Sequence, residues 1–175
     1  ESVPSRIVTQ GVFRYRTGEL GGMAEECGEY RDNIARLLQN AYLSQSEPKF
    51  LFGRDYAPRM PLARPLRFQN NLCDSDGVYF LVDLAIEQSG AFHLDLRSDS
   101  SLRVIVAFGE HLDDLRVRSY ISTRNFVFEV YTRAGKRTDF TALIRRIGAR
   151  YLQVYVEGNE FELYDCSIRP TDYPV

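Results

Sequence analysis

The sequence contains no tryptophan, and only two histidines and three cysteines among its 175 residues. Without tryptophan, a flat sugar-binding platform could be built only from tyrosine or phenylalanine, of which there are 11 each. The cysteines, Cys27, Cys73 and Cys166, show no zinc-ligand spacing. We therefore expect no metal and no cofactor, and three small, mostly buried thiols.

A charge of one sign and a long apolar run are missing as well. The formal net charge is −2, and acidic and basic residues are spread evenly along the chain. This balance excludes the basic excess of a nucleic-acid-binding protein. No apolar run approaches the roughly 18 residues of a membrane span. The chain opens at Glu1 without a signal peptide. The compartment therefore stays open, and we favour a periplasmic or secreted location.

The composition, with 44% hydrophobic and 26% charged residues, is that of an ordinary globular protein long enough to bury a core. We expect two parts, residues 1–70 and residues 71–175. The first part begins with a strand over residues 5–16 and continues with helical spacing of apolar residues over roughly 24–46. Prolines then break up residues 47–65. We expect this strand, short helix and connector to pack on the second part.

The second part has the period-two alternation of β-strands. Apolar side chains alternate in six short runs, at residues 78–84, 92–96, 102–108, 126–130, 152–156 and 161–163. Short polar or glycine-containing stretches separate most of the runs and predict antiparallel hairpins. The longer gap over residues 110–125 predicts a crossing between two sheets. The pattern therefore predicts a mainly β protein, folded as an antiparallel β-sandwich or jelly roll.

Several catalytic and metal-binding patterns are absent or incomplete. His93 and His111 do not form the His-x-His pair of a metal-binding jelly roll. Residues 74–77 (DSDG) resemble the start of a calcium loop but lack its later acidic ligands, so a turn is the better interpretation. No nucleophile elbow and no phosphate loop is present. The motifs nominate no catalytic residue.

One pair of charges shares the parity of an apolar strand face. Glu110 continues the even-numbered apolar series of residues 102–108, and Arg150 precedes the even-numbered series of residues 152–156. A lone charge at the rim of a core is costly, so two opposite charges there should pair. We predict a structural salt bridge between Glu110 and Arg150; a catalytic role for Glu110 is the alternative.

Five motifs, in order, resemble one known family. They are GVYFLVDL (77–84), QSGAFHL (88–94), FGEHLD (108–113), DFT (139–141) and GARYLQV (148–154). Together they resemble the β-sandwich module that precedes the catalytic domain in bacterial α-L-rhamnosidases of glycoside hydrolase family 78. The resemblance spans Gly77–Val175 and implies a galactose-binding-like sandwich. Ala85 departs from it, because the family has glycine there. Residues 146–149 depart from the family as well.

The resemblance implies a non-catalytic role for this chain. In the family, the acid and base residues lie in a helical barrel after the sandwich, and six residues after Arg169 cannot build one. We therefore expect the chain to brace a downstream catalytic domain of the same polypeptide, itself a glycoside hydrolase that cleaves rhamnosides. Rhamnose-containing glycans are the further partner that the resemblance implies.

Two other functions remain open at this point. One is a carbohydrate-binding module, in which exposed tyrosines stack on a sugar; Tyr79, Tyr151 and Tyr155 have outward parity on their strands. Cross-strand packing is the commoner use of such residues. The other is a protein-interaction sandwich unrelated to sugars.

Overall fold

The computed structural model describes residues 5–15, 34, 38, 41–46, 60–70, 74–113, 116–121 and 124–171, and β-strands dominate these ranges. Within them, no helix is both long and apolar enough to cross a membrane. The strands are β1 (Arg6–Arg14), β2 (Tyr42–Ser46), β3 (Leu66–Gln69), β4 (Gly77–Arg97), β5 (Arg103–Gly109), β6 (Leu112–Asp113), β7 (Arg116–Val117), β8 (Tyr120–Ile121), β9 (Arg124–Asn125), β10 (Val127–Tyr131), β11 (Arg137–Glu157) and β12 (Glu160–Pro170).

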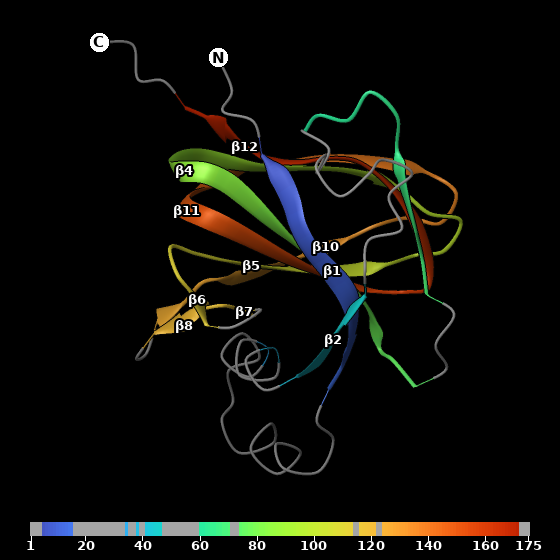
Figure 1. Cartoon of the computed structure of the whole chain (residues 1–175). Coiled ribbons are helices and arrows are strands. Elements are labelled where there is room, and N and C mark those ends of the chain that lie inside the picture. The colour runs from blue at the N-terminus through green and yellow to red at the C-terminus, as the bar shows by residue number, and fades with distance from the viewer. Residues whose placement is uncertain are drawn as a thin grey trace.

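Two long strands, β4 and β11, pair with each other and belong to both layers of a sandwich (Figure 1). In the first layer, the start of β4 lies between β1 and the end of β11, and the order is β2-β1-β4-β11-β5-β10. In the second layer, the end of β4 lies between the start of β11 and β12, which also pairs with β3. All these pairings are antiparallel, so the predicted β-sandwich is confirmed.

The long strands change layer at two irregularities in their pairing. The register shifts between Thr141 and Arg146 and again between Ala149 and Tyr151. Opposite the second shift, Ala85 of β4 has a φ of 66°, and its N–H donates to Asp83 Oδ1 at 2.8 Å. Extra residues of this kind bend and twist a strand. The bends let one strand supply apolar side chains to both layers.

The main core lies between the two layers. The first layer contributes residues such as Phe80, Val106 and Val154, and the second contributes residues such as Phe92 and Phe161, all at most 1% exposed. Cys166 is a buried free thiol in this core, as predicted, and burial raises its pKa. Cys27 and Cys73 lie outside the described residues.

A second apolar cluster covers the outer face of the first layer. Phe13, Tyr79 and Tyr155 of the sheet pack there with Ile34 and Leu38. The cover is tied down by Arg116 of β7, whose guanidinium donates to the Leu38 carbonyl oxygen at 3.0 Å and also to the Ala41 carbonyl oxygen. A segment from the first 70 residues therefore seals one face of the sheet.

Three local predictions require correction. Residues 88–90 do not turn a hairpin, because they lie inside the continuous strand β4. Residues 110–125 do not cross between layers, because the flanking strands β5 and β10 pair with each other. The N-terminal helix is not supported: residues 42–46 form β2, and most of the remaining segment lies outside the described residues. The predicted strand near residues 5–16 is confirmed as β1.

Candidate functional site

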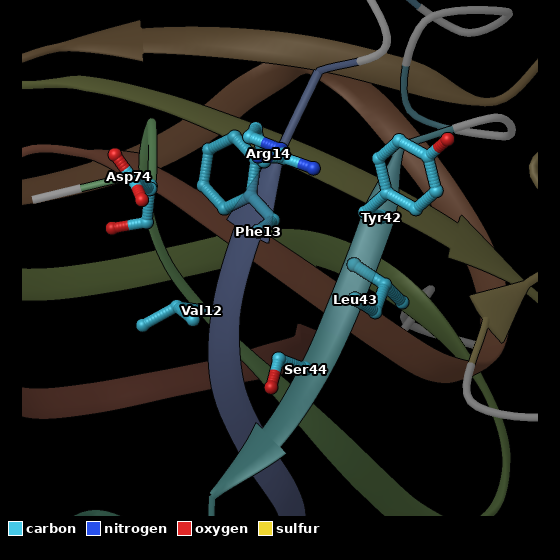
Figure 2. A pocket seen from close by; sticks show the side chains of 8 residues that line it. Val12, Phe13, Arg14, Tyr42, Leu43, Ser44 and Asp74 are labelled. Carbon is cyan, nitrogen blue, oxygen red and sulfur yellow. The ribbon is translucent and has the colours of Figure 1, made fainter. Parts of the chain in front are cut away.

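A pocket lies at the edge of the first layer, where β1 and β2 meet the turn that precedes β4; we call it the β1–β2 pocket (Figure 2). Its cavity measures about 300 Å³, near the lower end of the range for small-molecule sites. It is lined by Val12, Phe13, Arg14, Tyr42, Leu43, Ser44, Asp74 and Ser75.

Arg14 and Tyr42 form one side of the β1–β2 pocket. They are directly opposite each other in the antiparallel pairing of β1 with β2, so their side chains leave the same face of the sheet. The Arg14 guanidinium carbon lies 5.2 Å from the centre of the Tyr42 ring, which is within cation–π distance. Tyr42 is still 49% exposed. A charged fork and an accessible aromatic ring therefore stand together at the pocket.

Asp74 and Ser75 supply another part of the wall, on the far side of β1 from Tyr42 in Figure 2. Their turn is fastened to β1 by two hydrogen bonds through Asp76. The Asp76 N–H donates to the Phe13 carbonyl oxygen at 2.9 Å, and Asp76 Oδ2 accepts from the Tyr15 N–H at 2.7 Å. The turn predicted for residues 74–77 is therefore confirmed, and it holds the Asp74 carboxylate beside the pocket.

A second group of polar side chains lies on the outer face of the second layer. Arg137 grips Asp95 with two hydrogen bonds of 2.7 and 2.6 Å. His93 is only 2% exposed, with Nδ1 3.0 Å from Thr141 Oγ1 and Nε2 2.8 Å from an Arg169 nitrogen. Among the described residues, no cluster of histidine, cysteine and acidic side chains could hold a metal ion.

Asp165 is the member of this polar group with an unsatisfied oxygen. Its carboxylate is buried, and Oδ1 has no hydrogen-bond partner. Burial raises the pKa of Asp165, against the opposing influence of a hydrogen bond from Ser167. Because the other members are paired with one another, we interpret the group as a structural network on the sheet and not as a catalytic site.

The predicted tyrosines have different surroundings. Tyr79 and Tyr155 are 0% and 2% exposed, so the prediction that they are available to a sugar is wrong. Their outward parity is real, but Ile34 and Leu38 cover that face of the sheet. Burial also raises the pKa of both hydroxyls. Tyr151 is half-buried, with the Arg150 guanidinium 5.1 Å from its ring centre, and its contact with a sugar stays a prediction.

The predicted salt bridge is also corrected. Arg150 pairs with Asp83, at 3.5 Å between Nε and Oδ1, and the ion pairs found among the described residues include none between Arg150 and Glu110. β5 ends at Gly109, so Glu110 is exposed instead of continuing the apolar face. The register shift beside Arg150 turns its side chain outward. A parity count cannot anticipate either event.

The residues of the β1–β2 pocket were not nominated from the sequence. Tyr42 follows a helix-like spacing of apolar residues, which concealed the start of β2. Arg14 is one of many arginines, and only its pairing with Tyr42 distinguishes it. The single available signal was the turn that contains Asp74.

Comparisons with known proteins find similar folds among solved structures but do not assign the chain to a family. No family model and no curated protein matches the chain. Among solved structures, the chain is similar to a GH78 family rhamnosidase of Bacillus sp. GL1, with a TM-score of 0.57 and 24% identity over 66% of this chain. The match spans only 12% of the Bacillus enzyme. A rhamnosidase from Klebsiella oxytoca matches over 62% of this chain and 27% of that one, with a TM-score of 0.43 and 15% identity.

Proposed function

We propose that the chain is a non-catalytic β-sandwich domain of an α-L-rhamnosidase-like glycoside hydrolase and braces the catalytic domain of that enzyme. The observation that carries the proposal is the match to the Bacillus rhamnosidase, which covers two thirds of this chain but about an eighth of the enzyme. A match of that extent is expected for one module of a larger protein. The ordered motifs between Gly77 and Val154 support the same interpretation.

The surface of β11 supports a docking role. At the first register shift, β11 holds Leu143 and Ile144 out of the sheet, with exposures of 82% and 103%. Two adjacent aliphatic side chains with such exposure bury almost no apolar area within this chain. Covering them with another domain would remove that apolar area from water.

The absence of hydrolysis by the chain alone tests the non-catalytic role. We expect no release of nitrophenol when the purified chain is incubated with p-nitrophenyl α-L-rhamnoside. The physical reason is that Asp74 is the single carboxylate that lines the β1–β2 pocket, whereas glycoside hydrolysis uses a pair of carboxylates as acid and base. Turnover that copurifies with the chain through two different columns would contradict the proposal.

The glycosidase activity of the natural polypeptide that carries these residues distinguishes our proposal from the protein-interaction alternative. Our proposal requires that polypeptide to hydrolyse rhamnosides. A polypeptide without glycosidase activity toward any sugar would favour a protein-interaction sandwich instead.

A further inference from the structure

We propose that the β1–β2 pocket binds one ring of an uncharged sugar. The inference rests on the side chains of the pocket and on their arrangement, and only the choice of rhamnose as a first probe rests on the proposed function. The pocket differs from the site predicted at Tyr79 and Tyr155, which is closed by the cover over the first layer.

The charges in the pocket favour a neutral ligand. Arg14 contributes one positive charge and Asp74 one negative charge to the lining of the pocket. An anionic ligand would meet the Asp74 carboxylate, and a cationic ligand would meet the Arg14 guanidinium. A purely apolar ligand would desolvate both charges and return no hydrogen bond. A ligand with several hydroxyl groups avoids all three penalties.

The hydrogen-bonding groups match a polyhydroxylated ring. Arg14 can only donate, the Asp74 carboxylate can only accept, and the Ser44 hydroxyl can do both. Each sugar hydroxyl is likewise a donor and an acceptor. Hydrogen bonds to charged groups are the stronger ones, so Arg14 and Asp74 should fix the orientation of the ring.

An aromatic ring completes the chemistry. Tyr42 is half-exposed at the pocket, and tyrosine offers a rigid apolar ring with a polar tip. The C–H face of a pyranose can lie against such a ring while its hydroxyls face the polar groups. The Arg14 guanidinium beside the ring already restrains its orientation.

The pocket is preorganised, which lowers the entropic cost of binding. Arg14 and Tyr42 stand on two hydrogen-bonded strands, and the turn that bears Asp74 is bonded to β1 through Asp76. Asn70 also donates to Ser75 Oγ at 2.5 Å from outside the pocket. The wall therefore needs little rearrangement to receive a ligand.

The test is a titration of the ¹⁵N-labelled full chain with L-rhamnose, D-galactose and D-glucose, followed by amide shifts, with glycerol as a polyol that has no ring. We expect at least one sugar to saturate between 1 and about 20 mM, which is the weak range suited to a single ring. The shifts should centre on Val12, Arg14, Ser44 and Asp74.

Substitutions locate the site. Tyr42→Leu and Asp74→Asn should each weaken the binding of that sugar by about tenfold, through loss of the ring and of the carboxylate. Tyr131→Leu is the matched control, because Tyr131 is an exposed tyrosine on β10, at the opposite edge of the same layer. Its affinity should stay within about twofold of the unmodified chain. Tyr42→Phe, which keeps the ring, should bind nearly as well. If Tyr42→Leu does not fold, the loss of binding in Asp74→Asn locates the site.

Several results would overturn the inference. They are the absence of shifts with all three sugars, shifts centred away from β1 and β2, equal shifts with glycerol, or equal losses in the Tyr131 control. None of them would touch the proposed bracing role, which is tested by hydrolysis and by domain removal. Conversely, the natural polypeptide could lack glycosidase activity while the pocket still binds a sugar. That result would support the sugar site and contradict the proposed role in a glycoside hydrolase.

Discussion

Ala85 occupies a backbone conformation that side chains with a Cβ avoid. Its φ of 66° lies in the left-handed region, which costs an L-residue roughly 1–2 kcal/mol. The sequence already distinguished this position, because the resembled family has glycine where this chain has alanine. The structure supplies the physical reason, since β4 bends here between the two layers.

Replacing Ala85 with glycine should therefore stabilise the protein. We expect Ala85→Gly to raise the free energy of unfolding by about 0.5–1 kcal/mol, because relief of the left-handed strain exceeds the added freedom of the unfolded chain. Urea unfolding followed by circular dichroism measures the change. The control is Ala91→Gly in the same strand, where φ is ordinary and the methyl group is buried; it should destabilise. Equal effects of the two substitutions would refute the argument.

Asp165 should make the protein less stable as the pH rises. Burial raises its folded-state pKa above the ordinary value of about 3.9, so the folded state holds the proton more tightly than the unfolded state. The penalty is present above the folded-state pKa and disappears as the pH falls toward 3.9.

We therefore expect Asp165→Asn to stabilise the fold by about 1 kcal/mol at pH 7, where the unmodified side chain is a buried carboxylate with one unpaired oxygen. Unfolding curves measured at pH 7 and at about pH 4 give the comparison. The gain should shrink at the lower pH. A gain that is the same at both values would mean that ionisation of Asp165 is not its cause.

The burial and the partners of individual side chains are the features that the sequence predicts least well. Parity placed Tyr79 and Tyr155 on the outer face correctly, yet the cover over that face is contributed by residues some 40 positions earlier in the chain or more. A parity count assigns Arg150 to the wrong face, because a single register shift reverses the parity of a strand. Burial and pairing of single side chains depend on such long-range events.

At the level of elements, the alternation of apolar residues predicted most strands but not their continuity. Residues 88–90 contain a glycine between two apolar runs, which is typical of a hairpin. In the structure, Gly90 instead allows close approach to β12: a Cβ built on it would overlap the Arg169 carbonyl oxygen. The glycine marks a crowded strand pairing, and a sequence pattern does not distinguish the two uses.

A pair of glycine substitutions tests this interpretation. Gly90→Ala should destabilise the fold by about 1–3 kcal/mol, because β12 must move to admit the methyl group. Gly148→Ala, on the neighbouring strand, has only Glu87 Oε1 within 4 Å of the added carbon, at 3.9 Å. It should be neutral or stabilising by up to about 1 kcal/mol. Thermal unfolding of both variants measures the change in stability. If Gly90→Ala is as stable as the unmodified chain, crowding against β12 does not require glycine at this position.

At the level of the whole molecule, the fold class followed from the sequence because period-two alternation survives wherever one face of a sheet is buried. The layer order did not follow, since β4 and β11 each belong to both layers. The pocket was invisible for a related reason. It joins residues 12–14, 42–44 and 74–75, which only the pairing of β1 with β2 and the anchored turn bring together.

Under the proposed bracing role, the exposed pair Leu143 and Ile144 on β11 makes a prediction for the natural polypeptide. In the natural polypeptide, Leu143→Ser with Ile144→Ser should lower the melting temperature of the catalytic domain, because an apolar contact is lost. The same double substitution in the 175-residue chain should leave its stability nearly unchanged, since both side chains are exposed there. Tyr131→Ser is the control for a distant exposed side chain. A double variant that melts like the unmodified enzyme would exclude this surface as the docking contact.

The bracing role itself is tested most directly by removing the domain. The measurement compares the natural polypeptide with and without residues 1–175. Its readout is the temperature at which rhamnosidase activity is lost on heating. The proposed bracing role predicts that the shortened polypeptide loses rhamnosidase activity at a clearly lower temperature than the intact one. Identical thermal profiles of the two forms would contradict it.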